Sequence, residues 1–214
     1  MIIPSRFPEY IVAAMVIILA PGPSVLFVIA RAIAWGRATA VFTVAGNVTG
    51  AFSLSVFVAL GLGPVLERSE IAYVAVQWAG GLYLIYLGIE AIWKRSLQAA
   101  DMANQGDTAP SIRRSLRDGF WVGALNPKGV VFFAAVLPQF IDRDRGGVTA
   151  QLIFLGAVFA ILAFFSDGSW GVLAGTARKW LATDSKRLEK LRATGGAIMI
   201  LLGIQVLVSA IVSG

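Results

Sequence analysis

Six apolar runs dictate what this chain can fold into. Each is long enough to cross the hydrocarbon core of a bilayer, which takes about 20 residues of α-helix. The runs cover residues 8-30, 38-63, 71-93, 117-141, 148-174 and 192-212. Little sequence remains for a separate soluble domain. The sequence therefore predicts an all-α polytopic membrane protein with six transmembrane helices in a lipid bilayer.

The first run is predicted to be a retained transmembrane helix rather than a secretory signal peptide. A signal peptide begins with basic residues and has an apolar core of about 7 to 15 residues. This run is longer, and Pro4 and Glu9 stand where lysines would be expected.

Composition agrees with a membrane chain and narrows its chemistry. Charged residues make up only 14% of the 214 residues, against about a quarter in a soluble domain. The chain has neither cysteine nor histidine, the usual ligands of zinc, haem and iron–sulfur clusters. We therefore predict no metal site and no cofactor. An enzyme is disfavoured, because the commonest general base near neutral pH is missing.

Basic residues are distributed unequally between alternate loops, and this predicts the orientation. Thirteen fall on one side, at Arg31, Arg37, Lys94, Arg95, Arg113, Arg114, Arg117, Arg178, Lys179, Lys186, Arg187, Lys190 and Arg192. Four fall on the other, at Arg6, Arg68, Arg143 and Arg145. An excess of Lys and Arg marks the cytoplasmic side. Both termini are thus predicted outside, and the net charge of +6 reflects membrane topology rather than nucleic-acid binding.

A glycine motif of the third run recurs in the sixth. "GGLYLIYLGI" at 80-89 and "GGAIMILLGI" at 195-204 align at one constant offset, so that Gly80 and Gly81 correspond to Gly195 and Gly196. This indicates a three-helix unit that occurs twice, at 1-93 and 117-214, joined by a cytoplasmic linker at 94-116. Because a unit with three membrane crossings inserts its second copy upside down, the sequence predicts two inverted repeats.

Helix-breaking residues interrupt the first run of each predicted repeat. The first run contains Pro21, Gly22 and Pro23, and the fourth contains Asn126 and Pro127. A proline frees backbone groups that hydrocarbon cannot satisfy, so such breaks occur where protein or a wet cavity can. We predict broken helices 1 and 4 that face each other near the middle of the membrane, as in many secondary transporters. The alternative is a simple packing kink.

Two charged side chains lie deep inside predicted spans. Lys128 is eleven residues into the fourth run, about 16 Å of helix from its end. Asp167 is the only acid well inside the fifth run. A salt bridge between them is one hypothesis, and opening it on substrate or proton binding would couple transport to the proton gradient. A purely structural pair, or a lysine that reaches the membrane surface, is the competing interpretation.

Polar and aromatic residues elsewhere receive simpler predictions. Asn47 is predicted to lie beside the cavity, because its amide would be unsatisfied in lipid. The acids near span ends, Glu9, Glu90 and Asp118, are predicted to be solvated. Aromatic residues near span ends, Tyr10 and Trp121 among them, are predicted to form interfacial belts.

The chain resembles the LysE/RhtB family of bacterial amino-acid exporters, which includes homoserine-, threonine- and leucine-type efflux proteins. The likeness covers nearly the whole chain and rests on "APGPS", "GNVTG", "GGLYLIYLG", "GFWVGALNPKGVVFFAAVLPQF" and "DGSW". The resemblance implies export of amino acids or their derivatives across the bacterial inner membrane, driven by protons. The matching motif positions are Pro21, Gly22, Pro23, Asn126, Pro127 and Lys128. Some relatives have an acidic or polar residue where this chain has Ala51, which favours neutral or apolar substrates here.

The sequence thus predicts a transport site and a set of packing positions. The site comprises Pro21, Gly22, Pro23, Ser24, Asn47, Asn126, Pro127, Lys128 and Asp167. The helix-packing positions are Gly46, Gly50, Gly80, Gly81, Gly195 and Gly196. The alternative function is an ion or metal-ion permease of the same architecture, against which stands the scarcity of ligands for cations. A monomer and a homo-oligomer both remain open.

Overall fold

The computed structural model describes residues 3–20, 22–94, 109–177 and 185–213. In these residues all regular structure is helical, which confirms the predicted all-α class. The elements are α1 (Phe7–Leu19), α2 (Pro23–Trp35), α3 (Arg37–Arg68), α4 (Glu70–Trp93), α6 (Ile112–Ala124), α7 (Pro127–Val131), the π-helical turn η1 (Phe132–Val136), the 3-10 turns η2 (Leu137–Phe140) and η3 (Arg143–Arg145), α8 (Val148–Thr176) and α10 (Ser185–Ser213).

Length and apolar composition identify the membrane-spanning elements. Residues 37–61 of α3 and all of α8 can each cross a bilayer. The pairs α1 with α2, and α6 with residues 127–140, can each cross as one broken span, bent by 50° and 45°. The remaining two predicted runs are occupied by α4 and α10, of 24 and 29 residues. The chain is therefore a multi-pass membrane protein whose first and fourth spans are broken, as predicted.

The fourth span differs from its prediction at both ends. Its helix begins at Ile112 rather than at 117, because Ser111 caps it by accepting a hydrogen bond from the Arg114 amide at 3.3 Å. Beyond Val131 the α-helical pattern gives way to the π-helical turn η1 and then to η2. Most of the predicted linker 94-116 lies outside the described residues.

The helices α3 and α6 pack closely enough to require glycine. A Cβ at Gly50 of α3 would overlap the carbonyl oxygen of Phe120 on α6. Gly46 on α3, and Gly119 and Gly123 on α6, are equally close to the backbone of the opposite helix. Small residues allow this approach between membrane helices, whose association depends on packing rather than on the hydrophobic effect.

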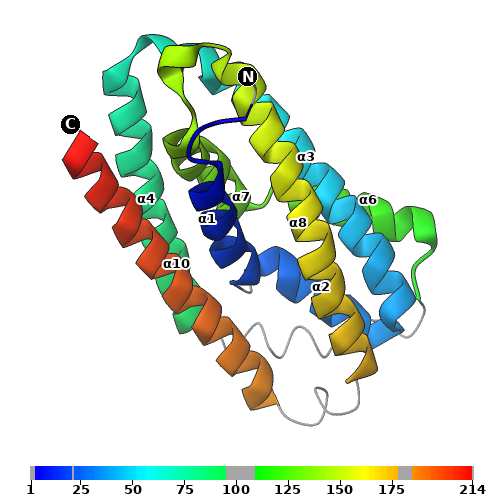
Figure 1. The fold of residues 1–214 in the computed structure, drawn as a ribbon. Helices are drawn as coiled ribbons and strands as arrows, with labels where there is room; N and C mark the ends of the chain where they lie inside the picture. The colour runs from blue at the N-terminus through cyan, green and yellow to red at the C-terminus, as the bar shows by residue number, and fades with distance from the viewer. Residues whose placement is uncertain (1–2, 21, 95–108, 178–184, 214) are drawn as a thin grey trace.

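The helices α4 and α10 cross as an antiparallel pair along one flank of the molecule (Figure 1). Gly81 lies against Gly203, and Gly88 lies against Gly196. In the repeated motif Gly81 corresponds to Gly196 and Gly88 to Gly203, so exchanging the two helices reproduces both contacts. This is the pattern expected when two copies of one unit are related by a twofold axis.

Replacing Gly50 with alanine should destabilise the protein, whereas the same change at Gly61 of the same helix should not. Alanine improves helix propensity equally at both sites. At Gly50 its Cβ meets the backbone of Phe120, while at Gly61 it meets nothing within 4 Å. We expect Gly50→Ala to lower the free energy of unfolding by about 1 to 3 kcal/mol, as overpacking does. Thermal unfolding of the purified variants in detergent measures this. Equal stability of the two variants would contradict the packing role.

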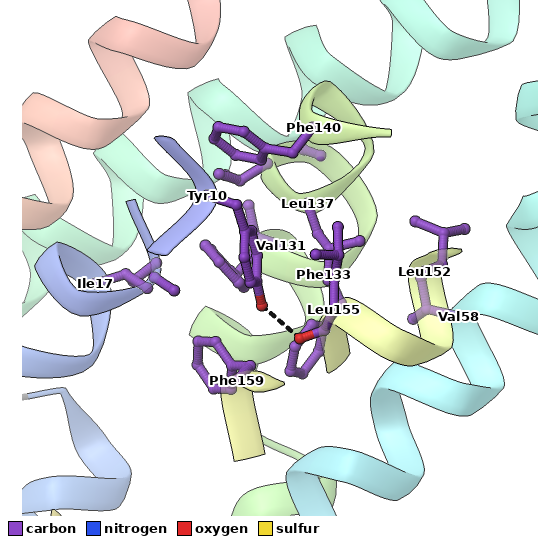
Figure 2. Close-up of a cluster of buried hydrophobic side chains, with 14 of the residues drawn as sticks. Tyr10, Ile17, Val58, Val131, Phe133, Leu137, Phe140, Leu152, Leu155 and Phe159 are labelled. Carbon is purple, nitrogen blue, oxygen red and sulfur yellow. Dashed lines mark hydrogen bonds between the residues drawn. The ribbon is translucent and has the colours of Figure 1, made fainter. Parts of the chain in front are cut away.

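An apolar cluster fills the space between α1, the π-helical turn and α8 (Figure 2). Tyr10 lies at its centre, fully buried, and donates a hydrogen bond from its hydroxyl to the Leu155 carbonyl at 2.6 Å. The prediction that Tyr10 belongs to an interfacial belt was therefore wrong, because tertiary packing covers it. Trp121 is 54% exposed, consistent with an interfacial position.

Candidate functional site

The two broken turns are built alike. Gly22 and Asn126 are the extended residues that precede α2 and α7, and each is followed by a proline at the first helical position. Proline is tolerated there because a helix does not use that N–H group. The carbonyls of Gly22 and Asn126 accept the first helical hydrogen bonds, both at 3.0 Å. Each break is thus an orderly helix start inside a membrane span.

Lys128 reaches across from the second break to the first. Its ammonium Nζ donates to the carbonyls of Ile17 and Ala20, both at 2.9 Å. The last carbonyls of a helix have no partner within it, so this lysine satisfies the end of α1 and places a positive charge at its negative pole. Lys128 is only 6% exposed, which overturns the alternative that it reaches the membrane surface.

A second contact joins the breaks directly. Asn126 Nδ2 donates to Ser24 Oγ at 3.0 Å, while Asn126 Oδ1 accepts from the Lys128 amide at 3.1 Å. The side chain of Lys128 also passes over Gly22, where a Cβ would lie 3.1 Å from both Cε and Nζ. A side chain at Gly22 would therefore push the ammonium out of place.

Asp167 lies on α8 and faces the breaks with a partner on α3. Asn47 Nδ2 donates to Asp167 Oδ2 at 3.3 Å. Within the described residues, Asp167 Oδ1 and Asn47 Oδ1 are buried without a hydrogen-bond partner. The hypothesis of a direct salt bridge was wrong, since the ion pairs within 4.0 Å among described residues do not join Lys128 to Asp167. Backbone carbonyls hold the ammonium instead.

These groups surround one small cavity. Its volume is about 30 Å³, which holds about two water molecules. The lining residues are Ile17, Ile18, Ser24, Val25, Asn47, Val48, Ala51, Asn126, Lys128, Gly129, Phe132, Phe133, Phe159, Ala163 and Asp167. The cavity therefore combines one cationic and one anionic side chain with apolar walls.

The residues of the predicted transport site lie in or beside the cavity wherever the structure describes them. Ser24, Asn47, Asn126, Lys128 and Asp167 line the cavity. Gly22, Pro23 and Pro127 form the helix starts beside it. Pro21 lies outside the described residues.

The predicted packing glycines lie at three interfaces. Gly46 and Gly50 contact α6, while Gly81 and Gly196 belong to the α4–α10 crossing. A Cβ at Gly80 would meet Ala135 of the π-helical turn. Gly195 lies within α10.

Sequence reasoning missed a partly buried ion pair away from the cavity. The assignment of Arg31 to a cytoplasmic loop was wrong, because Arg31 lies within α2, whereas Asp118, predicted to be solvated, keeps a side chain that is 21% exposed. Arg31 is 7% exposed inside α2, and its Nη2 donates to Asp118 Oδ2 on α6 at 2.8 Å. The available signal was the position of Arg31 within an apolar helix, with Phe27 four residues before it and Trp35 four residues after.

Comparison with known proteins agrees with this architecture. A sequence model of the LysE type translocator family matches residues 15–210. The homoserine/homoserine lactone efflux protein of Salmonella typhimurium is 31% identical over 194 residues, 91% of this chain and 92% of that protein. The leucine efflux protein of Enterobacter sp. is 27% identical over 189 residues, 87% of each chain. The uncharacterised membrane protein YrhP of Bacillus subtilis is 29% identical over 202 residues, 92% and 95% of the two chains. No solved structure matches.

Proposed function

Because this chain belongs to the LysE type translocator family, we propose that it is a secondary transporter, not an enzyme, that exports amino acids or their derivatives from the cytoplasm. Two relatives are named for efflux of homoserine and of leucine. The observation that carries the proposal is the cavity between the two broken spans, with an ammonium and a carboxylate on its walls.

The ammonium of an amino acid binds at Asp167 and Asn47. The Oδ1 atom of each side chain can accept hydrogen bonds, is buried, and has no donor within the described residues. A buried acceptor without a partner costs about 1 to 3 kcal/mol, which a donor on the substrate would recover. An ammonium supplies such donors together with a charge opposite to that of the carboxylate.

The substrate carboxylate binds on the opposite wall, towards Lys128 and the start of α2. The first-turn amides of a helix have no intrahelical partner, and the positive pole of the helix dipole favours an anion there. Ser24 lies in that first turn and lines the cavity. A zwitterion thus exchanges its hydration for hydrogen bonds to protein.

The substrate side chain is neutral or apolar. The remaining walls are hydrophobic and include Phe132, Phe133, Phe159 and Ala163. The two charged side chains of the lining are already matched by the two charges of the zwitterion. A charged substrate side chain would therefore be desolvated without a counter-charge, which is costly in such a site.

Proton coupling operates through Asp167. When the site is empty of amino acid, a proton occupies the carboxylate in place of the substrate ammonium. Exchange between these two cations on opposite sides of the membrane would link export to the proton gradient. The single carboxylate at the site supports this assignment, because the same group would bind the proton and the substrate ammonium in turn.

The proposed topology follows the predicted repeats. Residues 1-93 and 117-214 form two inverted units joined by a cytoplasmic linker at 94-116, in the bacterial inner membrane with both termini outside. The paired glycine contacts between α4 and α10 support a twofold relation between the units. Rocking of one unit against the other would open the cavity alternately to each side.

Reconstitution into liposomes tests the function. Vesicles that contain the purified protein and a pH gradient should move labelled leucine and homoserine faster than labelled lysine or glutamate, and dissipating the gradient should stop accumulation. Protein-free liposomes are the control. Labelled metal and alkali cations in parallel vesicles address the alternative permease. Cation movement without amino-acid movement would overturn the proposal.

A further inference from the structure

The Arg31–Asp118 ion pair connects the two broken spans at one end of the cavity. Arg31 lies on α2, eight residues after Pro23, and Asp118 lies on α6, eight residues before Asn126. Eight residues of helix extend about 12 Å. The pair thus lies beyond the breaks, on the side where α2 ends, which the proposed orientation places in the cytoplasm.

A different polar contact joins the same two spans at the opposite end. The Ser5 hydroxyl and amide donate to the two carboxylate oxygens of Asp142, at 2.6 and 2.8 Å. These bonds hold the pKa of the Asp142 carboxyl below its usual range. Arg6 adds a hydrogen bond to the Gln139 carbonyl at 2.9 Å. Polar contacts therefore join the two broken spans at both ends, with the cavity between them.

The ion pair is built so that it can separate. The guanidinium of Arg31 lies over the rings of Phe27 and Trp35 on its own helix, at 4.7 and 5.2 Å from their centroids. Asp118 has two further cationic neighbours on its own helix, Arg117 at 3.1 Å and Arg114 at 3.7 Å. Each partner therefore keeps a stabilising neighbour when the pair opens, so neither becomes an isolated buried ion.

The surrounding packing also allows movement there. The helix α6 packs far more extensively on α3 than on α2. Arg31 Nε and Nη1 are buried without a hydrogen-bond partner in the described structure, so the pair does not use the full bonding capacity of the guanidinium. An ion pair with spare donors, between two helices that pack little on each other, can break and re-form, unlike the glycine contacts between α3 and α6.

From these contacts we propose that Arg31 and Asp118 form the inner gate of the transport path. Separation of the pair lets α2 move away from α6 and opens the cavity on that side, while the Ser5–Asp142 contact keeps the other side closed. This inference rests on the proposed transport function but concerns access to the cavity rather than the identity of the substrate.

A single introduced thiol can report access to the cavity, because the chain has no cysteine. Ala163 lines the cavity and is 4% exposed, and cysteine there is a small change. The Ala163→Cys protein would be labelled with a membrane-impermeant thiol reagent in everted and in right-side-out vesicles. Adding Asp118→Ala should raise the labelling rate in everted vesicles about tenfold. The reason is that the state in which the ion pair is formed loses a stabilising contact, so the equilibrium shifts towards the state that is open on this side. Labelling in right-side-out vesicles should not rise.

Two matched variants complete the test. Asp142→Ala should accelerate labelling only in right-side-out vesicles, and Asp118→Glu, which keeps the charge, should restore the slow rate. If Asp118→Ala cannot be recovered, Asp118→Asn should give a smaller increase in the same vesicles. An increase confined to right-side-out vesicles would overturn the assignment of the pair as the inner gate, because the pair would then control access from the outer side.

Unchanged labelling on both sides, or an equal increase on both, would overturn the gate and leave a structural ion pair. Because labelling requires no substrate, this result is independent of the transport assay. The two assays together therefore distinguish a protein that exports amino acids without this gate from a gated protein that exports none.

Discussion

Replacing Lys128 with methionine should abolish amino-acid export and destabilise the first broken span. Methionine keeps most of the length of the side chain but removes the donors that reach the carbonyls of Ile17 and Ala20. Each buried carbonyl left without a donor costs about 1 to 3 kcal/mol. The same loss removes the positive charge proposed to face the substrate carboxylate, and about 3 kcal/mol of lost binding corresponds to about 100-fold. Proteoliposome export and thermal unfolding in detergent measure the two effects.

A matched lysine outside the site provides the control. Lys94 forms an exposed pair with Glu90, at 2.7 Å and four residues apart. Exposed pairs of this kind contribute little to stability, so Lys94→Met should retain export. Export by Lys128→Met at the rate of Lys94→Met would remove Lys128 from the transport site. Lost export with unchanged stability would show that other donors satisfy the end of α1.

Replacing Asp167 with asparagine should stop proton-driven export while leaving the protein folded in the membrane. Asparagine has nearly the same shape and keeps an oxygen that can accept the hydrogen bond from Asn47. It carries no negative charge for the substrate ammonium and does not exchange a proton. Hydrogen bonds to charged groups contribute about 1.5 to 3 kcal/mol, so we expect export to fall by about 10- to 100-fold.

Glu9 offers the corresponding control for this carboxylate. It is exposed near the start of α1 and is not among the residues that line the cavity. Glu9→Gln makes the same chemical change and should keep full activity. Measuring uptake against a pH gradient and exchange of internal for external substrate separates coupling from binding. Full proton-driven export by Asp167→Asn would remove the carboxylate from coupling.

Periodicity and breaker residues were enough to predict the spans because both act locally. A run of apolar residues forms a helix in hydrocarbon whatever lies around it, since the backbone has no other way to satisfy its polar groups. The prolines at 23 and 127 likewise limit where a helix can begin. These local features predict the breaks in the first and fourth spans without any information on tertiary contacts.

Pairwise contacts could not be predicted in the same way. Lys128 and Asp167 were expected to bind each other because their charges are opposite, but Lys128 donates to the end of α1. The backbone carbonyls that accept from it become available only where the broken helix ends. Every residue has a backbone carbonyl, so residue types do not indicate which carbonyls will act as acceptors. Arg31 and Asp118 show the converse, because an arginine assigned to a loop meets an acid of a distant span when α2 and α6 are brought together.

The sequence by itself determined the membrane environment, the number of apolar spans and the two interruptions, because these depend on transfer into hydrocarbon and on backbone geometry within a few residues. The tertiary structure alone decided which polar groups meet. It placed Asn47 of α3 against Asp167 of α8, and it buried Arg31 against a helix far along the chain. Hydrogen bonds and ion pairs are short-ranged, so their partners are fixed only when packing brings distant segments within about 3 Å.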